Sequence, residues 1–341
     1  MSAPGTESGS RRHAWSLIVA VPLAAVLLWL SVRGVDWRGV WNAIAGARLV
    51  FLALGGALMC VALSLRALRW RILLSAGERF GFGTVFSAMM AGYLGNNFLP
   101  ARAGELIRSI AISRRSSLTT AYVLTTALGE RLMDAITLVL WSSLIVLAWG
   151  STPRWMADVS RAAAVVSIAG ALVIALLPHV GGPVHKLIGL LPLPAKFREP
   201  LLHLADQVML GVRAFHHPGR FFGFAALTAA IWTTDAFTVV VLARSLGPHL
   251  TFGAAMLFVT ALGLSSALPS TPGYVGIYQF VAVTVLVPFG VGRDTALAYS
   301  LVAQAMTYTV MLLLGLPSVY EVFTGKSGTG IPACVGFNHT Q

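Results

Sequence analysis

The sequence predicts an all-α integral membrane protein with about six transmembrane helices, two re-entrant hairpins and an inverted repeat. Hydrophobic residues make up 57% of the 341 positions and charged residues only 11%, whereas about a quarter of a soluble domain is charged. The hydrophobic residues form continuous runs that approach the roughly 20 residues needed to cross a hydrocarbon core of about 30 Å. Two further runs are interrupted by similar proline-containing breaks, one in each half of the chain.

Six runs are expected to cross the membrane, in chain order. The first is expected to be a retained helix; a cleaved signal peptide is the alternative, but no small-residue cleavage site follows the run directly. The third is the later part of an apolar stretch that begins at residue 118 and is too long for one straight span, so its start is expected in the interface. The runs cover residues 14–32, 49–65, 129–149, 162–178, 221–243 and 296–316.

Two apolar segments, residues 82–99 and 252–288, are expected to be hairpins that return to their own side. The first ends at Pro100, and the second is broken between Pro269 and Pro272, because proline cannot continue a helix. If residues 82–99 crossed, the arginines that follow would face outward, against the positive-inside tendency. Such broken backbone is tolerated at membrane depth only where it is buried in protein or lines a wet cavity.

The remaining segments frame this transmembrane domain, which is expected to cover residues 14–320. Residues 1–13 are expected to be a cytoplasmic tail and residues 321–341 a polar C-terminal tail. Within the loop from 179 to 220, four apolar residues at helical spacing predict an amphipathic surface helix; a short helix packed on the bundle is the alternative. These four are Leu201, Leu204, Val208 and Val212.

The two halves of the chain, about 14–150 and 151–320, resemble each other in plan. Pro100 and Pro269 lie 169 positions apart, and the spans that begin at 49 and 221 lie 172 apart. Each half has three crossings and one hairpin, and because three is odd the halves must have opposite orientations. This is the plan of an inverted-repeat transporter whose site lies where the broken helices meet. Coincidence among apolar, proline-containing segments is the alternative.

The net charge of +12 points to membrane lipids as the partner. The basic residues lie between the apolar runs, where juxtamembrane arginines and lysines are expected, so we expect no nucleic-acid partner. An anionic phospholipid or an aminoacylated lipid is the expected partner; a homo-oligomer or a membrane synthase partner remains open. The two cysteines and eight histidines show no metal-ligand spacing, and we expect neither a metal nor another cofactor.

The first group of candidate substrate-binding residues surrounds the break of the first hairpin. Arg102 and Glu105, and Glu105 and Arg108, are three positions apart and can pair on a helix that begins after Pro100. The N–H groups of that helix start, together with Arg102, form a potential phosphate-binding corner. Asn97 precedes the break and belongs to the same group. Ordinary cytoplasmic anchoring is the alternative role.

A second group is charged and lies within the spans. Glu130, Arg131 and Asp134 fall within one helix, with Glu130 and Asp134 on the same face, and Asp235 lies inside another span. Charges at the bilayer centre cost about 2.5–3.5 kcal/mol each on insertion scales, so we expect them to be paired; interfacial flanking charges are the alternative. For Asp235 a hairpin arginine such as Arg102 is the expected partner.

The third group, Ser270, Thr271 and Gly273, offers hydroxyls and free carbonyls in the break of the second hairpin. A tight structural break is the alternative role for these residues. We expect residues 97–104 and 269–276 to be neighbours within the bundle. Arg102 is the hypothesised main phosphate contact, with Glu105 and Asp235 as counter-charges, and the sequence shows no pair of nucleophile and base.

These motifs resemble the transmembrane domain of lysylphosphatidylglycerol synthases, also called flippase-like proteins. The resemblance covers about residues 15–320 and rests on residues 97–108, Glu130-Arg131 with Asp134, residues 268–276 and Arg69-Trp70. In the full-length relatives a soluble C-terminal domain transfers an aminoacyl group to phosphatidylglycerol and the membrane part flips the product. This chain ends soon after its last span, so the resemblance implies a transporter rather than an aminoacyl transferase.

The resemblance leaves the cargo open. It implies translocation of a phospholipid or of a polyprenyl- or hopanoid-type lipid between the leaflets of the cell membrane. The alternative is a membrane enzyme or an accessory subunit in the synthesis of a lipid-linked glycan or cell-envelope lipid.

Both chain termini are expected to be cytoplasmic, because sixteen basic residues then lie inside and seven outside. A variant that retains Cys334 as its only cysteine should therefore resist a membrane-impermeant thiol reagent in intact cells. Permeabilised cells, in which the same reagent should react, are the control. Rapid labelling of intact cells would contradict the orientation.

Overall fold

In the computed structural model the elements of secondary structure among the described residues are all helices joined by turns and loops, and no strand occurs among those residues. The all-α prediction is confirmed for this part of the protein. The described residues are 22, 24–99, 103–148, 154–176, 202, 217–265 and 272–324.

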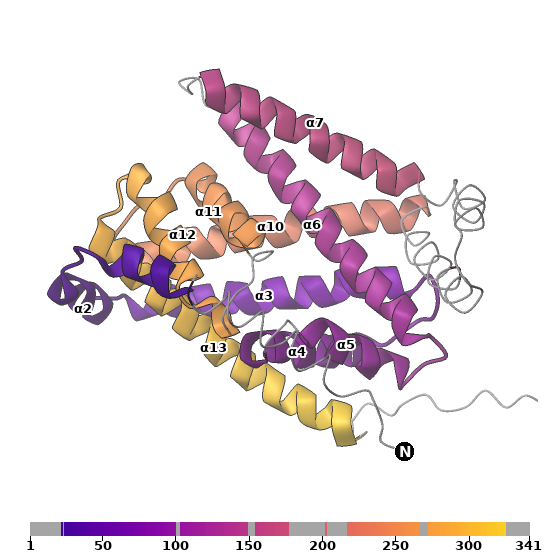
Figure 1. Cartoon of the computed structure of the whole chain (residues 1–341). Coiled ribbons are helices and arrows are strands. Elements are labelled where there is room, and N and C mark those ends of the chain that lie inside the picture. Colours follow the sequence, from indigo (N-terminus) through magenta and orange to yellow (C-terminus); the bar gives the residue numbers. More distant parts are fainter. Residues whose placement is uncertain are drawn as a thin grey trace, which may run out of the picture.

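Among the described residues, four helices are long and apolar enough to cross a membrane. They coincide with four of the six predicted spans and are labelled in Figure 1. Of the other two, the span predicted at 162–178 falls on α7 (Arg154–Leu176), whose apolar part is Ser160–Leu172; the first run is helical over 24–32, and most of its remainder lies outside the described residues. The four long helices are α3 (Leu49–Leu74), α6 (Thr120–Ala148), α10 (Pro218–Ser245) and α13 (Arg293–Thr324).

Two of these helices depart from their predicted limits. The sequence analysis ended the second span at residue 65, but α3 continues to Leu74. The stretch 118–149, predicted to start in the interface and to cross from residue 129, is one continuous helix, α6, that begins at Thr120. The physical reason is the same for both: the added turns pack inside the bundle, where the indole of Trp70 donates a hydrogen bond to Thr126 Oγ1 (3.2 Å).

Short helices form at both predicted hairpins. In the first, the predicted segment 82–99 is the single helix α4 (Phe82–Phe98), and the helix packed back against it, α5 (Gly104–Ser113), lies beyond that segment. In the second, α11 (Phe252–Ser265) is followed by the 3-10 turn η4 (Pro272–Tyr274) and by α12 (Ile277–Leu286). The short helix α2 (Trp37–Ala45) precedes α3, and the 3-10 turn η5 (Val287–Phe289) leads from α12 towards α13. The surface helix predicted in the loop from 179 to 220 lies almost entirely outside the described residues.

Glycines allow the two helices of the first hairpin to approach closely. A Cβ added to Gly104 would lie 1.9 Å from the carbonyl oxygen of Gly92, and one added to Gly95 would lie 3.1 Å from the Cα of Gly104. Small residues at such a contact let two backbones touch, as is common between helices in membranes. The close contact places Arg108, one turn further along α5, beside Gly92.

α3 and α10 lie side by side and run antiparallel (Figure 1). Gly55, near the start of α3, contacts Leu242 near the end of α10, whereas Ile72, near the end of α3, contacts Gly223 near the start of α10. The first residues of the two helices, Leu49 and Pro218, are 169 positions apart, which equals the separation of the two proline breaks. The helices that correspond by sequence offset therefore cross with opposite directions.

The hairpin of each half packs against the last long helix of the other half. α4 contacts α13, where Ser87 donates a hydrogen bond to Glu321 (2.7 Å), and α11 contacts α6, where Ser142 donates one to Thr260 (2.6 Å). Each of the two hydrophobic cores likewise includes a residue from the last long helix of the other half. Leu138 of α6 joins the core formed mainly by residues 232–303, and Met311 of α13 joins the one formed mainly by residues 63–123.

The described parts of the two breaks are neighbours, as predicted. η4 contacts α4, and the carbonyl oxygen of Gly273 accepts a hydrogen bond from the hydroxyl of Tyr308 (3.1 Å), whose ring lies 6.2 Å from that of Phe98. Residues 100–102 and 266–271, which complete the breaks, lie outside the described residues.

Substituting Gly104 by alanine should separate α4 from α5, because the new methyl group would overlap the backbone of Gly92. We expect a loss of about 1–3 kcal/mol of stability, as is typical of overpacking, measured as thermal unfolding of the purified protein in detergent. Gly83→Ala is the matched control, since no atom lies within 4 Å of an added Cβ there. Equal unfolding temperatures for the two variants would contradict this account of the hairpin.

Candidate functional site

The centre of the candidate site is Arg69, whose side chain is buried in the last third of α3. Its Nε and Nη2 donate to Glu130 Oε1 (3.1 and 2.9 Å), and its Nη1 and Nη2 donate to the two carboxylate oxygens of Asp134 (2.5 and 2.8 Å). Nη1 also donates to Thr228 Oγ1 of α10 (3.0 Å). All five N–H donors of the guanidinium are thus used, and Arg69 joins α3 to both α6 and α10.

Arg108 of α5 is equally buried and lies on the other side of Glu130. Its Nη1 donates to Glu130 Oε2 (3.1 Å), and its Nη2 lies 2.6 Å from Glu105 Oε2 in an ion pair. The guanidinium stacks over the indole of Trp70, 4.6 Å from the ring centroid. The Glu105–Arg108 pair expected from their spacing is therefore present, and Glu130 bridges two arginines.

Arg131 of α6 completes the cluster. Its Nε and Nη2 both donate to Glu105 Oε1 (3.1 and 2.9 Å). Six side chains thus form one chain of alternating charges, in the order Asp134, Arg69, Glu130, Arg108, Glu105 and Arg131. Three arginines balance three carboxylates, which offsets the large desolvation cost of burying each charge alone.

A second ion pair, between Arg66 and Asp235, joins α3 to α10. Arg66 stacks over the ring of Trp232 at 5.5 Å, and the indole N–H of Trp232 donates to Asp134 Oδ1 (3.2 Å). Trp232 therefore connects this pair to the charged chain. The sequence analysis expected Arg102 as the partner of Asp235; the structure gives that role to Arg66, because the antiparallel crossing of α3 and α10 places the two residues face to face.

The structure brings together five of the predicted site residues: Glu105, Arg108, Glu130, Arg131 and Asp134. The pairing expected for the intramembrane charges is confirmed. The three carboxylates among them are also candidates to hold a cationic headgroup or to keep Arg102 and Arg131 in place. In the structure Glu105 does pair with Arg131, whereas Glu130 and Asp134 pair with Arg69, and Glu130 pairs with Arg108 as well.

Other predicted residues lie apart from the cluster or outside the described residues. The side-chain amide of Asn97 donates to the carbonyl of Tyr93 in its own helix (2.9 Å). Gly273 was expected to offer a free carbonyl, but that oxygen accepts from Gln304 Nε2 (2.6 Å) as well as from Tyr308. Four predicted residues lie outside the described part of the chain: Pro100, Arg102, Ser270 and Thr271.

The start of the helix after the first break also differs from expectation. α5 begins at Gly104, and its first N–H donates to Asn96 Oδ1 of α4 (3.0 Å). The sequence analysis expected the N–H groups of this helix start to be free for a phosphate. Because the hairpin is so tight, an amide of the preceding helix reaches one of them, so this part of the proposed phosphate corner is occupied by the protein itself.

Sequence reasoning missed Arg66, Arg69 and Trp232 as site residues. The two arginines follow the predicted span 49–65 and were counted among the basic residues expected inside, but both are members of the charged network. A signal was present: Arg69 is followed by Trp70 and then by Leu73 and Leu74, so the hydrophobic pattern of the helix continues beyond it. The resemblance of Arg69-Trp70 to the family motif pointed to the same place.

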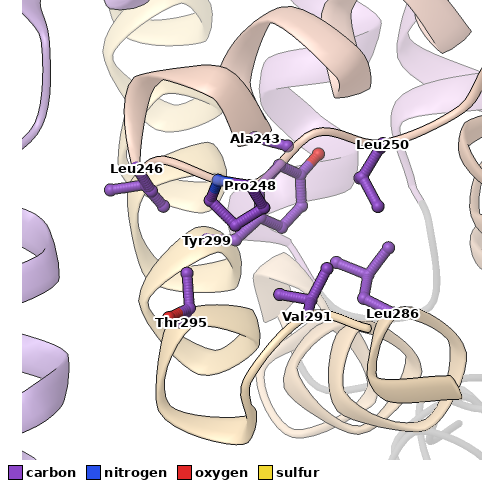
Figure 2. A pocket seen from close by; sticks show the side chains of 8 residues that line it. All are labelled: Ala243, Leu246, Pro248, Leu250, Leu286, Val291, Thr295 and Tyr299. Carbon is purple, nitrogen blue, oxygen red and sulfur yellow. The ribbon is translucent and has the colours of Figure 1, made fainter. Parts of the chain in front are cut away.

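Elsewhere in the described structure, the features do not suggest another site. The described residues contain no group of three or more metal-binding side chains. Figure 2 shows the side chains around a shallow hollow where the ends of α10 and α12 meet the start of α13, lined mainly by apolar residues such as Leu246, Leu286 and Val291. It leaves almost no space even for a water molecule, whereas usual ligand pockets measure roughly 300–1,000 Å³.

Comparison with known proteins bears out the family resemblance. The profile of the family described as the lysylphosphatidylglycerol synthase TM region matches residues 14–315. Glycosyltransferase AglD of Haloferax volcanii is 25% identical over 90% of this chain, but the match covers 54% of AglD, so this chain spans about half the length of that relative.

Two further relatives match over nearly their whole length. A UPF0104 membrane protein of Methanothermobacter thermautotrophicus is 22% identical over 94% of this chain and 96% of its own. The UPF0104 membrane protein PH1989 of Pyrococcus horikoshii is 21% identical over 88% of this chain and 94% of its own. The similarity therefore extends over the helices that carry the charged cluster.

Exchanging the charges of Arg66 and Asp235 tests their pairing. Arg66→Asp and Asp235→Arg should each lower the unfolding temperature, because each places two like charges together, and the double variant should recover most of the loss. We expect a coupling energy of about 1–3 kcal/mol, measured by unfolding in detergent. The same exchange of the exposed pair Asp158 and Arg161 on α7 is the control, with about 0–1 kcal/mol expected. A double variant no more stable than the sum of its single changes would exclude the pairing.

Proposed function

Because this chain belongs to the lysylphosphatidylglycerol synthase transmembrane-region family, we propose that it moves a lipid between the two leaflets of the cell membrane. The cargo is a phospholipid or a polyprenyl- or hopanoid-type lipid. The single observation that carries the proposal is the alternating chain of six charged side chains inside a bundle of apolar helices, directly beside the broken hairpin. Polar and ionisable residues within membrane segments are costly and commonly mark substrate paths.

A lipid headgroup that crosses the membrane must exchange its hydration for polar protein groups. Unsatisfied polar groups in the hydrocarbon core cost several kcal/mol, so the path needs hydrogen-bonding side chains at depth. Within the described residues such groups are concentrated on α3, α5, α6 and α10. The second hairpin adds the carbonyl of Gly273, which accepts a hydrogen bond from Gln304. A lipid-handling role accounts for this concentration of polar groups in an apolar bundle.

An inverted repeat supports the same function. The corresponding helices α3 and α10 are antiparallel, and each hairpin packs on the last long helix of the other half. Arg66 and Asp235 are separated by 169 positions, the same offset as the two proline breaks, so the ion pair joins equivalent positions of the two halves. In inverted-repeat transporters one half rocks against the other around a central site, and this pair lies at that contact.

The proposed orientation places both termini in the cytoplasm of a multi-pass protein of the cell membrane. Because Arg66, Arg69 and Arg108 are paired within the bundle, they no longer count as cytoplasmic anchors. The remaining basic residues expected inside still outnumber those expected outside, which supports the orientation.

Within this proposal Arg102 remains the main phosphate contact. Arginine suits that role because its planar fork can pair with a phosphate through two hydrogen bonds. Glu105 acts as an orienting group rather than as a free acid, since it is held by Arg108 and Arg131. Asp235 contributes the counter-charge of Arg66.

A second candidate function is favoured by one relative. Glycosyltransferase AglD bears an enzyme name and matches 90% of this chain, which supports a role as an enzyme or accessory subunit in the synthesis of a lipid-linked glycan. The two functions differ in what purified protein does alone: a translocator moves labelled lipid in proteoliposomes, whereas an accessory subunit does not.

Arg102→Lys and Arg102→Ala should slow translocation, because lysine loses the bidentate geometry and alanine loses the charge as well. We expect a decrease of about tenfold or more for alanine, as for a lost charge-assisted hydrogen bond of about 1.5–3 kcal/mol. The measurement is the accessibility of fluorescent headgroups to an impermeant quencher in proteoliposomes. Arg79→Ala, an exposed arginine between α3 and α4, is the control. Wild-type rates in both Arg102 variants would reduce Arg102 to an anchor.

A further inference from the structure

The three arginines of the charged chain differ in how accessible they are. The side chains of Arg69 and Arg108 are each 1% exposed, whereas that of Arg131 is 46% exposed. On the same helix, Leu128 and Leu132 are 55% and 52% exposed. Arg131 therefore stands at the outer end of the charged chain, among apolar side chains that face out of the bundle.

The guanidinium of Arg131 uses only some of its N–H donors within the described residues. Nε and Nη2 both donate to one oxygen of Glu105, and within the described residues Nη1 has no hydrogen-bond acceptor. Glu105 divides its single charge between two arginines, Arg108 and Arg131. The ring of Tyr93 lies 5.7 Å from the guanidinium and restricts it further. The arginine is thus held in place while its charge is only partly compensated.

The order of charges adds to this effect. The chain begins at Asp134, which is buried and accepts from Trp232, and it ends at Arg131, which is accessible. Its positive end therefore faces outward. An exposed positive charge among apolar side chains is costly in a membrane, and an anionic group supplied by a lipid would remove that cost.

We propose that Arg131 binds the phosphate of a lipid headgroup at the seam between α6 and the α4–α5 hairpin, while the lipid's acyl chains lie along Leu128 and Leu132. The inference rests on the proposed function and deepens it: Arg131 is a second phosphate contact in addition to Arg102, and the cargo class is a phosphate-bearing lipid. Arginine presents several N–H groups in one plane, the geometry that phosphate oxygens accept best. Glu105 and Tyr93 position the guanidinium, and the side chain does not have to be ordered when the lipid arrives.

Lipid binding to the purified protein tests the assignment without requiring transport. The protein in neutral detergent is titrated with phosphatidylglycerol or with a galactolipid, which lacks phosphate, and bound copies are counted by native mass spectrometry. Wild type should prefer phosphatidylglycerol, and Arg131→Gln should bind it about tenfold more weakly, as expected for one lost hydrogen bond to a charged group, with galactolipid binding unchanged. Arg114→Gln removes one exposed charge at the end of α5 and should behave as wild type.

Three results would overturn the assignment. The first is that Arg131→Gln binds phosphatidylglycerol as tightly as wild type. The second is that Arg114→Gln loses as much phosphatidylglycerol binding as Arg131→Gln. The third is that inorganic phosphate displaces phosphatidylglycerol from wild type, which would show that the site binds the free anion. If Arg131→Gln does not fold, Arg131→Lys carries the test: it keeps a charge for Glu105 but loses the planar fork, so binding of phosphatidylglycerol should weaken while that of galactolipid does not. Failure of the wild type to translocate lipid would count against the proposed function but not against this binding site.

Discussion

The alternating chain of buried charges is the constraint on which the rest of the structure depends. Each carboxylate in it contacts at least one arginine, and Arg69 uses all of its donors on Glu130, Asp134 and Thr228. Removing one partner of such a pair leaves an uncompensated charge in a medium of low dielectric constant, which typically costs about 3–5 kcal/mol. Because the members come from α3, α5, α6 and α10, the packing of these helices is coupled to the geometry of the charges.

The first hairpin places two of these charged residues, Glu105 and Arg108, against α6. Glycines at the contact of α4 and α5 let the backbones touch, and Asn96 caps the first N–H of α5. The start of the helix is thereby fixed. On its first turns, Glu105 pairs with Arg131 of α6, and Arg108 pairs with Glu130 of α6. Small residues, which contribute little to hydrophobic burial, thus determine where the most polar groups of the bundle lie.

The relation between the two halves places a second, simpler interaction at their contact. Arg66 and Asp235 occupy equivalent positions along antiparallel helices, and each hairpin is completed by a helix of the opposite half. The halves are also joined by other hydrogen bonds, such as those from Arg69 to Thr228 and from Trp232 to Asp134, and by two hydrophobic cores. Because each core also contains residues of the opposite half, such as Leu138 and Met311, the two halves are packed together as one bundle.

Hydrophobic run length and proline position were enough to predict an all-helical membrane bundle, four of its long helices and the places where shorter apolar helices interrupt them, because those features depend on local sequence and on the thickness of a membrane. The spacing of Glu105 and Arg108, and of Glu130 and Asp134, likewise predicted which charges share a helix face. Only the tertiary structure decided that Arg66 and Arg69 belong to the site and that Arg66, not Arg102, pairs with Asp235. Their partners lie between 61 and 169 positions away, and the crossing of antiparallel helices, which no local pattern records, determines which charges meet.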